Sequence, residues 1–327
     1  MHETVGDASF AEWTFPETSH LQRGLEEVFR DEGLVEIIGR EPNVRAAYYP
    51  SEVVACRFRE GHTRQLLLKY AVNPDEAQGG RLTGPKYERL VYEHVLNRRE
   101  SSVPAFYGCH LDPVSGALWG VTEYLEGAVH AHKMYPQAHG LGRAAGWIGA
   151  FHAVGEREIR LSGTPPLHRH DGSFYRRWAE WTLEYEDRQQ PWLRQFVRRY
   201  DEVIDDLLAR PQVIVHGDYF ADNILVCGDT VRPVDWELAA VGAGEVDLAT
   251  LIVGWETEQD VLDSCRREYE MARWGESPRV ELSRALDAAM LHVLFVLLGE
   301  DPSLPNRETR QWRLSLLKAA GQRLELI

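Results

Sequence analysis

The sequence predicts an α+β protein in which a β-rich first part is followed by a mainly helical second part. Two observations support this prediction. Short runs of β-branched residues dominate residues 34–70, whereas beyond Gly127 apolar residues recur mostly at helical spacing. The change in character near Glu126 divides the chain into two predicted domains, residues 1–126 and residues 127–327.

In the first domain we expect a small sheet and two helices. Leu21, Leu25 and Phe29 recur every four residues, which predicts a helix over residues 18–31. A proline at the start of residues 85–99 favours a second helix there. The predicted strands cover residues 35–38, 53–58, 65–70, 103–104 and 117–124.

In the second domain we expect helices interrupted by one β-rich island. Its strands are short apolar runs, which distinguishes them from the longer periodic segments on either side. The predicted strands cover residues 213–215, 224–226 and 232–234. The predicted helices cover residues 141–154, 174–186, 192–208, 246–255, 259–273, 279–298 and 309–324.

The charge balance and the apolar runs exclude several classes of partner. The chain has 36 Lys and Arg against 51 Asp and Glu, a formal net charge of −15. A surface this negative repels phosphate backbones, so nucleic acid is not expected as a partner. The start of the chain is acidic and shows no signal peptide, and the longest apolar run, residues 288–298, is too short to span a bilayer. The four cysteines have no CxxC spacing. We therefore expect a cytoplasmic protein without a membrane partner.

The β-rich island carries the strongest chemical signal. Asp218 and Asn223 lie in a loop between two short apolar strands, and Asp235 follows the next strand, so all three are expected at one end of a sheet. Two carboxylates and an amide oxygen suit a hard cation together with a base directed at a hydroxyl group. The alternative is that Gly-Asp and Asp-Asn merely form turns.

The spacing of this island resembles a known family. The run His216-Gly217-Asp218, followed by four residues and Asn223, resembles the catalytic loop of protein kinases. Gly217 in place of arginine, and Asp235-Trp236-Glu237 in place of Asp-Phe-Gly, are similar to the aminoglycoside phosphotransferase and choline kinase family. The resemblance covers about residues 34–255. It implies a bilobal, protein-kinase-like fold and transfer of the γ-phosphate of ATP to small-molecule hydroxyl groups.

The resemblance also implies roles for single residues. Asp218 is the expected catalytic base, and Asn223 and Asp235 are the expected Mg²⁺ ligands. His216 is expected to support the loop. Asp247 matches an acidic residue that braces the loop from a helix start, although it could equally be a first-turn carboxylate that stabilises its own helix.

Lys69 lies in an apolar strand, where an unpaired ammonium group is costly. The resemblance implies that it binds the α- and β-phosphates of ATP and pairs with Glu88. Glu93 is the rival partner, but Glu88 with Tyr92 four residues later matches the family pattern better. The alternative is an ordinary lysine on an edge strand.

The expected nucleotide contacts outside Lys69 are less distinctive. Residues 40–51, where a kinase carries a glycine-rich turn, contain no glycine. Ser51 could offer its hydroxyl group and backbone N–H to a phosphate, or the segment could be an ordinary hairpin connection. The resemblance places the hinge near Glu123 and Leu125, whose backbone groups are the expected adenine contacts.

Trp255, Glu256 and Glu258 lie where the family places acceptor contacts. Carboxylates beside an aromatic ring suit a cationic acceptor, although a solvated helix start explains them equally well. His130 and His132 could chelate a metal, but nothing in the sequence completes a ligand set, which favours solvated histidines. The helix residues Phe151-His152 match a family pair with a packing role.

The sequence therefore predicts an ATP- and Mg²⁺-dependent phosphotransferase that acts on a small molecule. We favour an amine-bearing antibiotic such as an aminoglycoside as the acceptor. The alternatives are a primary-metabolism kinase for an amino sugar, a choline-like amino alcohol or a nucleoside, and a nucleotide-binding pseudokinase that acts as a scaffold. The choice between ATP and GTP and the oligomeric state do not follow from the sequence.

Overall fold

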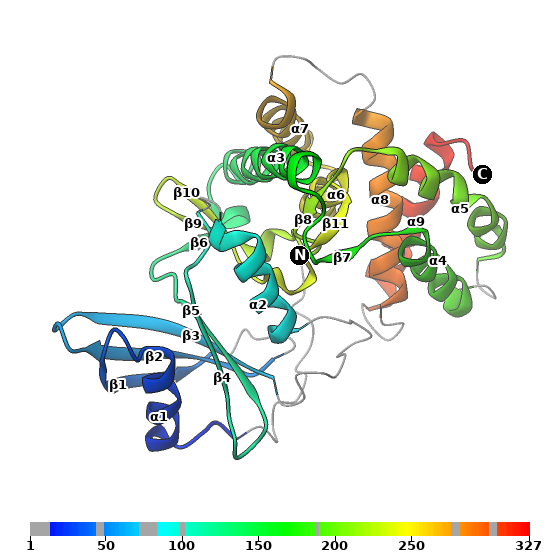
Figure 1. Cartoon of the computed structure of the whole chain (residues 1–327). Helices are drawn as coiled ribbons and strands as arrows, with labels where there is room; N and C mark the ends of the chain where they lie inside the picture. The colour runs from blue at the N-terminus through cyan, green and yellow to red at the C-terminus, as the bar shows by residue number, and fades with distance from the viewer. Residues whose placement is uncertain are drawn as a thin grey trace. The chain divides into compact units, whose positions relative to one another are not determined.

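The computed structural model describes residues 14–43, 49–71, 84–98, 102–186, 190–275, 282–300 and 306–327. The chain separates into two units, Met1–Ala128 and Val129–Ile327. A five-stranded sheet belongs to the first unit, and the second unit is mostly helical (Figure 1). The acidic start of the chain and residues 44–48 of the glycine-free segment lie outside the described residues.

The sheet of the first unit is antiparallel. Its strands are β1 (Leu34–Pro42), β2 (Ser51–Phe58), β3 (Thr63–Ala71), β4 (Phe106–Leu111) and β5 (Leu118–Glu123). They follow the order β1-β2-β3-β5-β4. Gly61 turns β2 into β3 with a positive φ of 88°, which glycine adopts without steric cost. In the register of the sheet, Lys69 lies opposite Ser51 on one side and Gly120 on the other.

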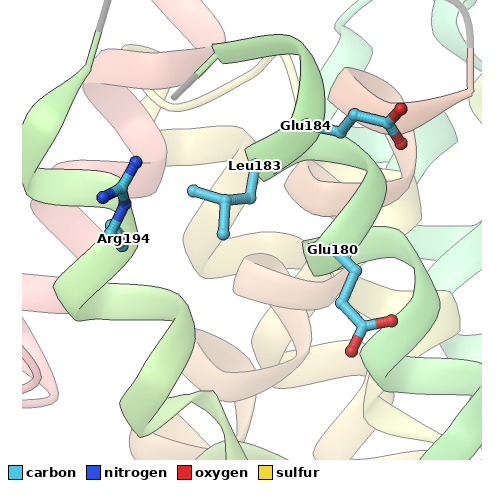
Figure 2. Close-up of a pocket in the computed structure, with 4 residues that line it drawn as sticks. All are labelled: Glu180, Leu183, Glu184 and Arg194. Carbon is cyan, nitrogen blue, oxygen red and sulfur yellow. The ribbon is translucent and has the colours of Figure 1, made fainter. Parts of the chain in front are cut away.

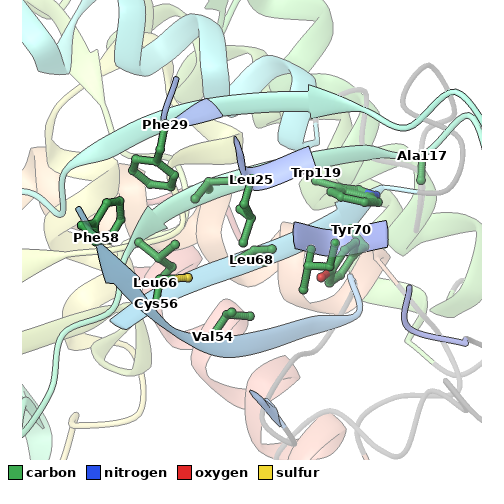
Figure 3. Packing of buried hydrophobic residues seen from close by; sticks show 12 residues of the cluster. Leu25, Phe29, Val54, Cys56, Phe58, Leu66, Leu68, Tyr70, Ala117 and Trp119 are labelled. Carbon is green, nitrogen blue, oxygen red and sulfur yellow. The ribbon is translucent and has the colours of Figure 1, made fainter. Parts of the chain in front are cut away.

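Helix α1 (Thr18–Val28) packs against this sheet and closes the core of the first unit. Leu21 and Leu25, one helical turn apart, are fully buried. Figure 3 shows Leu25 among side chains of the strands, including Leu68 and Trp119. The apolar residues that recur along this segment therefore form the buried face of the helix. Burial of their side chains stabilises the unit.

Helix α2 (Pro85–His94) begins with proline in its first turn, where the missing N–H of proline leaves no hydrogen bond unmade. It ends before the predicted limit at residue 99 and is followed by the 3₁₀ turn Leu96–Arg98. Tyr87, Glu88 and Val91 lie on its buried face. A charged residue on that face needs a partner, and Lys69 of β3 supplies it.

The expected strand at residues 103–104 was wrong, because the strand forms as β4 at Phe106–Leu111. Its sequence, Phe-Tyr-Gly-Cys-His-Leu, lacks the alternation of apolar and polar residues that signals a half-buried strand. Gly108 interrupts it with a φ of 140°, next to a shift in the register with β5. A glycine at an irregularity is a poor strand signal in sequence but a common feature of real strands.

The second unit is built around helix α8. Its helices are α3 (Gln137–Ser162), α4 (Gly172–Glu186), α5 (Pro191–Ala209), α6 (Glu245–Ile252), α7 (Gln259–Trp274), α8 (Leu282–Gly299) and α9 (Arg307–Arg323). Helix α8 packs against α4, α5, α6 and α9. Among the described residues, α8 is the one helix whose length and composition would allow it to cross a membrane. However, 72% of its residues are buried inside the structure. An apolar helix with this burial is a core helix.

The described residues of the second unit also form two three-stranded sheets, in the orders β10-β9-β6 and β7-β11-β8. The strands are β6 (Val129–His130), β7 (His168–Arg169), β8 (Gln212–Val215), β9 (Ile224–Cys227), β10 (Thr230–Pro233) and β11 (Ala240–Ala243). The predicted island corresponds to β8, β9 and β10. The other three strands were missed because two contain only two residues and the third reads Ala-Val-Gly-Ala. Neither length nor composition marks such segments as strands.

The core of the first unit can be tested with a pair of leucine variants. Leu68→Ala leaves a cavity in the cluster of Figure 3, and the free energy of unfolding should fall by about 2–5 kcal/mol. Leu111→Ala is the matched control because that side chain is 61% exposed, and it should change the value by about 0.5 kcal/mol or less. Chemical denaturation followed by tryptophan fluorescence measures both, and equal losses would contradict the assigned core.

Candidate active site

The loop between β8 and β9 places the predicted site residues of the second unit close together. Strand β8 ends at Val215 and β9 begins at Ile224. The backbone N–H of Val234 donates to the carbonyl oxygen of Asn223 at 2.9 Å. Because these two backbones lie side by side, Asp235 follows at the same end of the sheet as Asn223.

The side chain of Asn223 is fixed by Asp218. Its Nδ2 donates to the backbone carbonyl of Asp218 at 2.9 Å and to the carboxylate Oδ2 of the same residue at 2.8 Å. Both hydrogens of the amide are therefore used, and Oδ1 is the atom that Asn223 can offer to a cation. Asp218 is half-buried, so its side chain is held in place while the residue stays partly accessible to solvent.

Asp235 has a left-handed backbone with a φ of 70°, which is uncommon for a residue with a side chain. It precedes the 3₁₀ turn Trp236–Leu238. The ring of Trp236 is fully buried, with its centroid 5.2 Å from that of Phe151 and 4.4 Å from that of His216. This packing holds the strained backbone, and strain of this kind concentrates at functional sites.

Asp247 lies in the first turn of α6 and binds the start of the loop. Its side chain is fully buried. Oδ2 accepts a hydrogen bond from the backbone N–H of His216 at 2.7 Å, and Oδ1 accepts one from Gly217 at 3.0 Å. Burial acts to raise the pKa of Asp247, but the hydrogen bond and charge of His152 and the contacts with His216 hold the pKa below its usual value. The carboxylate is therefore ionised at neutral pH.

His152 contributes more than the packing role expected from the sequence. It is fully buried in α3, and its Nε2 lies 3.0 Å from Oδ2 of Asp247 while its Nδ1 lies 3.1 Å from the hydroxyl group of Tyr269. Since a carboxylate only accepts, Nε2 is the donor. In sequence, the signal for this contact is a histidine on the buried face of an apolar helix, where a polar partner is required.

His216 connects the loop to the strand that precedes Asp235. Its Nε2 donates to the carbonyl oxygen of Val234 at 3.0 Å, and its Nδ1 accepts from the backbone N–H of Asp218 at 3.3 Å. The hydrogen on Nε2 therefore points to Val234, and Nδ1 faces the backbone of Asp218. These are the contacts of a supporting residue.

In the first unit, Lys69 forms an ion pair with Glu88. Its Nζ lies 3.1 Å from Glu88 Oε2, and the two side chains are only 19% and 8% exposed. The alternative partner Glu93 instead accepts from Arg89 at 2.7 Å. Strand β3 lies between β2 and β5, so the alternative of an edge-strand lysine does not hold.

The other predicted nucleotide contacts also lie in the first unit. Ser51 is 4% exposed, and its hydroxyl group accepts a hydrogen bond from Nδ2 of Asn43 at 3.0 Å. Glu123, at the end of β5, accepts from the backbone N–H of Ala105 at 3.0 Å. Leu125 is buried just beyond that strand. The Ser51 hydroxyl group is therefore hydrogen-bonded to Asn43, the residue that directly follows β1.

Trp255, Glu256 and Glu258 follow the C-terminal end of α6, whose first turn carries Asp247. The backbone N–H of Gly254 donates to Oε1 of Glu256 at 2.9 Å, and burial raises the pKa of Glu256 above its usual value. Trp255 is half-buried, whereas Glu258 is exposed. One short helix therefore leads from the braced loop to the expected acceptor contacts.

An open pocket lies elsewhere in the second unit, between α4 and α5. Figure 2 shows Glu180, Leu183 and Glu184 on one helix and Arg194 on the next. The described residues that line it include none of those predicted for catalysis, metal binding or acceptor binding.

Comparison with known proteins identifies the family. The phosphotransferase enzyme family matches residues 87–314, which is more than half of the chain. The chain belongs to this family. The matched segment contains Asp218, Asn223 and Asp235, and it begins after Lys69. Comparison with curated proteins gives no match.

Solved structures of phosphotransferases share the fold. An aminoglycoside 2′-phosphotransferase of type IIIa, in complex with GDP, is 12% identical, with a TM-score of 0.60 over 94% of this chain and 98% of its own. Choline kinase LicA from Streptococcus pneumoniae is 13% identical, with a TM-score of 0.58 over 93% and 99%. Macrolide 2′-phosphotransferase type I is 18% identical, with a TM-score of 0.56 over 95% and 99%. The predicted α+β, kinase-like fold of the phosphotransferase family is confirmed.

The loop geometry predicts that Gly217 cannot be replaced. Its φ is 82°, and a Cβ would lie 2.1 Å from the carbonyl oxygen of Leu238, so Gly217→Ala should lower the free energy of unfolding by about 3 kcal/mol or more. Gly228→Ala is the matched control: its φ is 56° but nothing lies within 4 Å, so the cost should be about 1–2 kcal/mol. Denaturation curves of both variants give the comparison, and equal losses would argue against the close approach.

Proposed function

We propose that this phosphotransferase moves the γ-phosphate of ATP, with Mg²⁺, to a hydroxyl group of a small molecule. The observation that carries the proposal is the pairing of Asp218 and Asn223 at 2.8 Å in a loop whose start is bound by the buried Asp247. A positioned carboxylate beside an oriented amide oxygen suits proton acceptance together with cation binding.

In the proposed reaction, Asp218 accepts the proton of the acceptor hydroxyl group. The hydroxyl oxygen forms a bond to the γ-phosphorus, and the bond from that phosphorus to the leaving ADP oxygen breaks. Most of the rate enhancement in such transfers comes from positioning and charge neutralisation. The hydrogen bond from Asn223 supports this role because it restricts the rotation of the Asp218 carboxylate.

The donor set of the loop fits Mg²⁺, which prefers oxygen ligands. Asn223 would hold the ion through Oδ1, since both of its amide hydrogens bind Asp218. Asp235 would hold it through its carboxylate. Bound Mg²⁺ supplies positive charge to the phosphate oxygens during transfer.

The residues of the first unit would bind the nucleotide. Lys69 would contact the α- and β-phosphates, and Glu88 would orient its ammonium group. The 3.1 Å ion pair between them supports this, because it compensates the charge of a lysine that directly follows the apolar run Leu66–Leu68 of β3. Ser51 would contact a phosphate, and backbone groups near Glu123 and Leu125 would contact adenine. Because the proposed reaction consumes ATP, which the cytoplasm supplies, we propose that the protein is cytoplasmic.

For the acceptor we favour an amine-bearing antibiotic such as an aminoglycoside. Support comes from the net charge of −15, which attracts cations, and from the structural likeness to an aminoglycoside phosphotransferase. Trp255, Glu256 and Glu258 are the proposed acceptor contacts. A kinase for a choline-like amino alcohol is the second candidate, because the likeness to choline kinase is equally close. The ion pair of Lys69 and the ordered loop argue against a scaffold without activity.

The test is a panel of hydroxylated amines, neutral sugars and nucleosides, assayed for ATP consumption and for phosphate on the product. We expect turnover with a cationic acceptor. On that acceptor, Asp218→Asn should lower kcat by about 10²–10⁴-fold because the proton acceptor is lost, while ATP affinity stays the same. The matched control is Asp229→Asn, an exposed aspartate of the same unit, which should change neither quantity.

Two results would contradict the proposal. Retained turnover in Asp218→Asn would exclude this residue as the base. ATP binding without phosphate transfer to any member of the panel would favour the scaffold instead.

A further inference from the structure

A second group of ligand-type side chains lies next to the catalytic loop within the second unit. His130 in β6, His132 in the 3₁₀ turn Ala131–Lys133 and Asp222 in the 3₁₀ turn Ala221–Asn223 each bring one ligand atom to within 4.8 Å of the others. From the sequence alone nothing completed a ligand set for the two histidines, because Asp222 lies far along the chain.

Strand pairing explains how these residues meet. Strand β6 runs antiparallel to β9, with His130 opposite Leu225. The turn that carries Asp222 immediately precedes β9, so the residues that follow β6 lie beside it. Strand β6 is an edge strand and β9 is the central strand of this sheet, so backbone hydrogen bonds hold both segments in place.

The orientation of His132 favours a cation at this point. Its Nδ1 lies 3.2 Å from the carbonyl oxygen of Ala221 and therefore carries the hydrogen, because a carbonyl only accepts. Its Nε2 lies 3.8 Å from Oδ1 of Asp222. With the hydrogen on Nδ1, Nε2 can offer its lone pair to a cation that the carboxylate of Asp222 also binds. Metal-binding histidines commonly donate their second N–H to a backbone carbonyl in this way.

The donor set selects the kind of cation. Two imidazoles and one carboxylate suit Zn²⁺, Co²⁺ or Ni²⁺, whereas Mg²⁺ prefers oxygen ligands alone. Metal–ligand bonds of about 2.0–2.2 Å place tetrahedral ligand atoms about 3.4 Å apart, so ligand atoms that lie up to 4.8 Å apart must approach by as much as about 1.4 Å. Asp222 is exposed, and rotation of its side chain can supply much of this movement.

We propose that His130, His132 and Asp222 bind one divalent transition-metal ion at a site separate from that of Mg²⁺. The half-buried histidines and the exposed Asp222 leave coordination positions open to water. This proposal does not rest on the proposed function. Asp222 directly precedes Asn223, so a bound ion would restrain the turn that carries the proposed Mg²⁺ ligand.

The experiment is a titration of the full chain with Co²⁺ in excess Mg²⁺, followed by equilibrium dialysis and by the visible absorption bands of the bound ion. One Co²⁺ should bind saturably. His132→Ala and Asp222→Asn should each weaken binding by at least about tenfold and remove the bands, because each deletes a ligand. His139→Ala is the matched control, an exposed histidine of α3 in the same unit, and should bind as the wild type does.

A further variant separates the two metal sites. Asp235→Asn removes a proposed Mg²⁺ ligand but leaves the histidines intact, so it should retain the Co²⁺ bands. The competing explanation for the geometry is an ion pair of His132 with Asp222 that binds no metal. Binding only near millimolar Co²⁺, binding unchanged in both ligand variants, or loss of the bands in Asp235→Asn would overturn the proposal.

Discussion

The candidate site of the second unit depends on one buried charge, the carboxylate of Asp247. A buried carboxylate without partners is very costly, but this one accepts hydrogen bonds from the backbone of His216 and Gly217 and from the ring of His152. The donors belong to the loop after β8 and to α3, whereas Asp247 belongs to α6. The requirement to satisfy a single charge therefore fixes three elements in place.

This constraint accounts for the local features of the loop. Gly217 approaches the carbonyl of Leu238 so closely that a side chain cannot fit, and the ring of His216 reaches the backbone of Val234. With its start bound in this way, the loop presents Asp218 and Asn223 as a hydrogen-bonded pair. Our proposal that these residues transfer a proton and bind Mg²⁺ therefore rests on a geometry that Asp247 maintains. The net charge of −15 agrees with our proposal of a cationic acceptor, because a negative surface attracts cations.

Features with a local signature and contacts that belong to the family pattern were predictable, whereas distant contacts outside that pattern were not. Periodicity identified the helices, and the fixed spacing of Asp218 and Asn223 identified the loop, because chemistry at one point requires residue types at set intervals. The contact of His152 with Asp247 joins residues far apart in sequence, so only the burial of a polar ring hinted at it. The same holds for Asp222 beside His132, and for the short strands β6, β7 and β11, whose hydrogen bonds are imposed by tertiary structure. Glu88 was the predicted partner of Lys69 and Glu93 the rival, and the fold places Glu88 beside the lysine.

The most direct test of this account is hydrogen–deuterium exchange in Asp247→Asn. The substitution keeps the shape of the side chain but replaces one accepting oxygen with a donor, so a hydrogen bond to the loop is lost. Amides of residues 213–223 should exchange at least about tenfold faster than in the wild type, because loss of a hydrogen bond to a charged group costs about 1.5–3 kcal/mol. Amides of α9, which makes no described contact with Asp247, should be unchanged. Unaltered exchange in residues 213–223 would contradict the claim that Asp247 holds the loop.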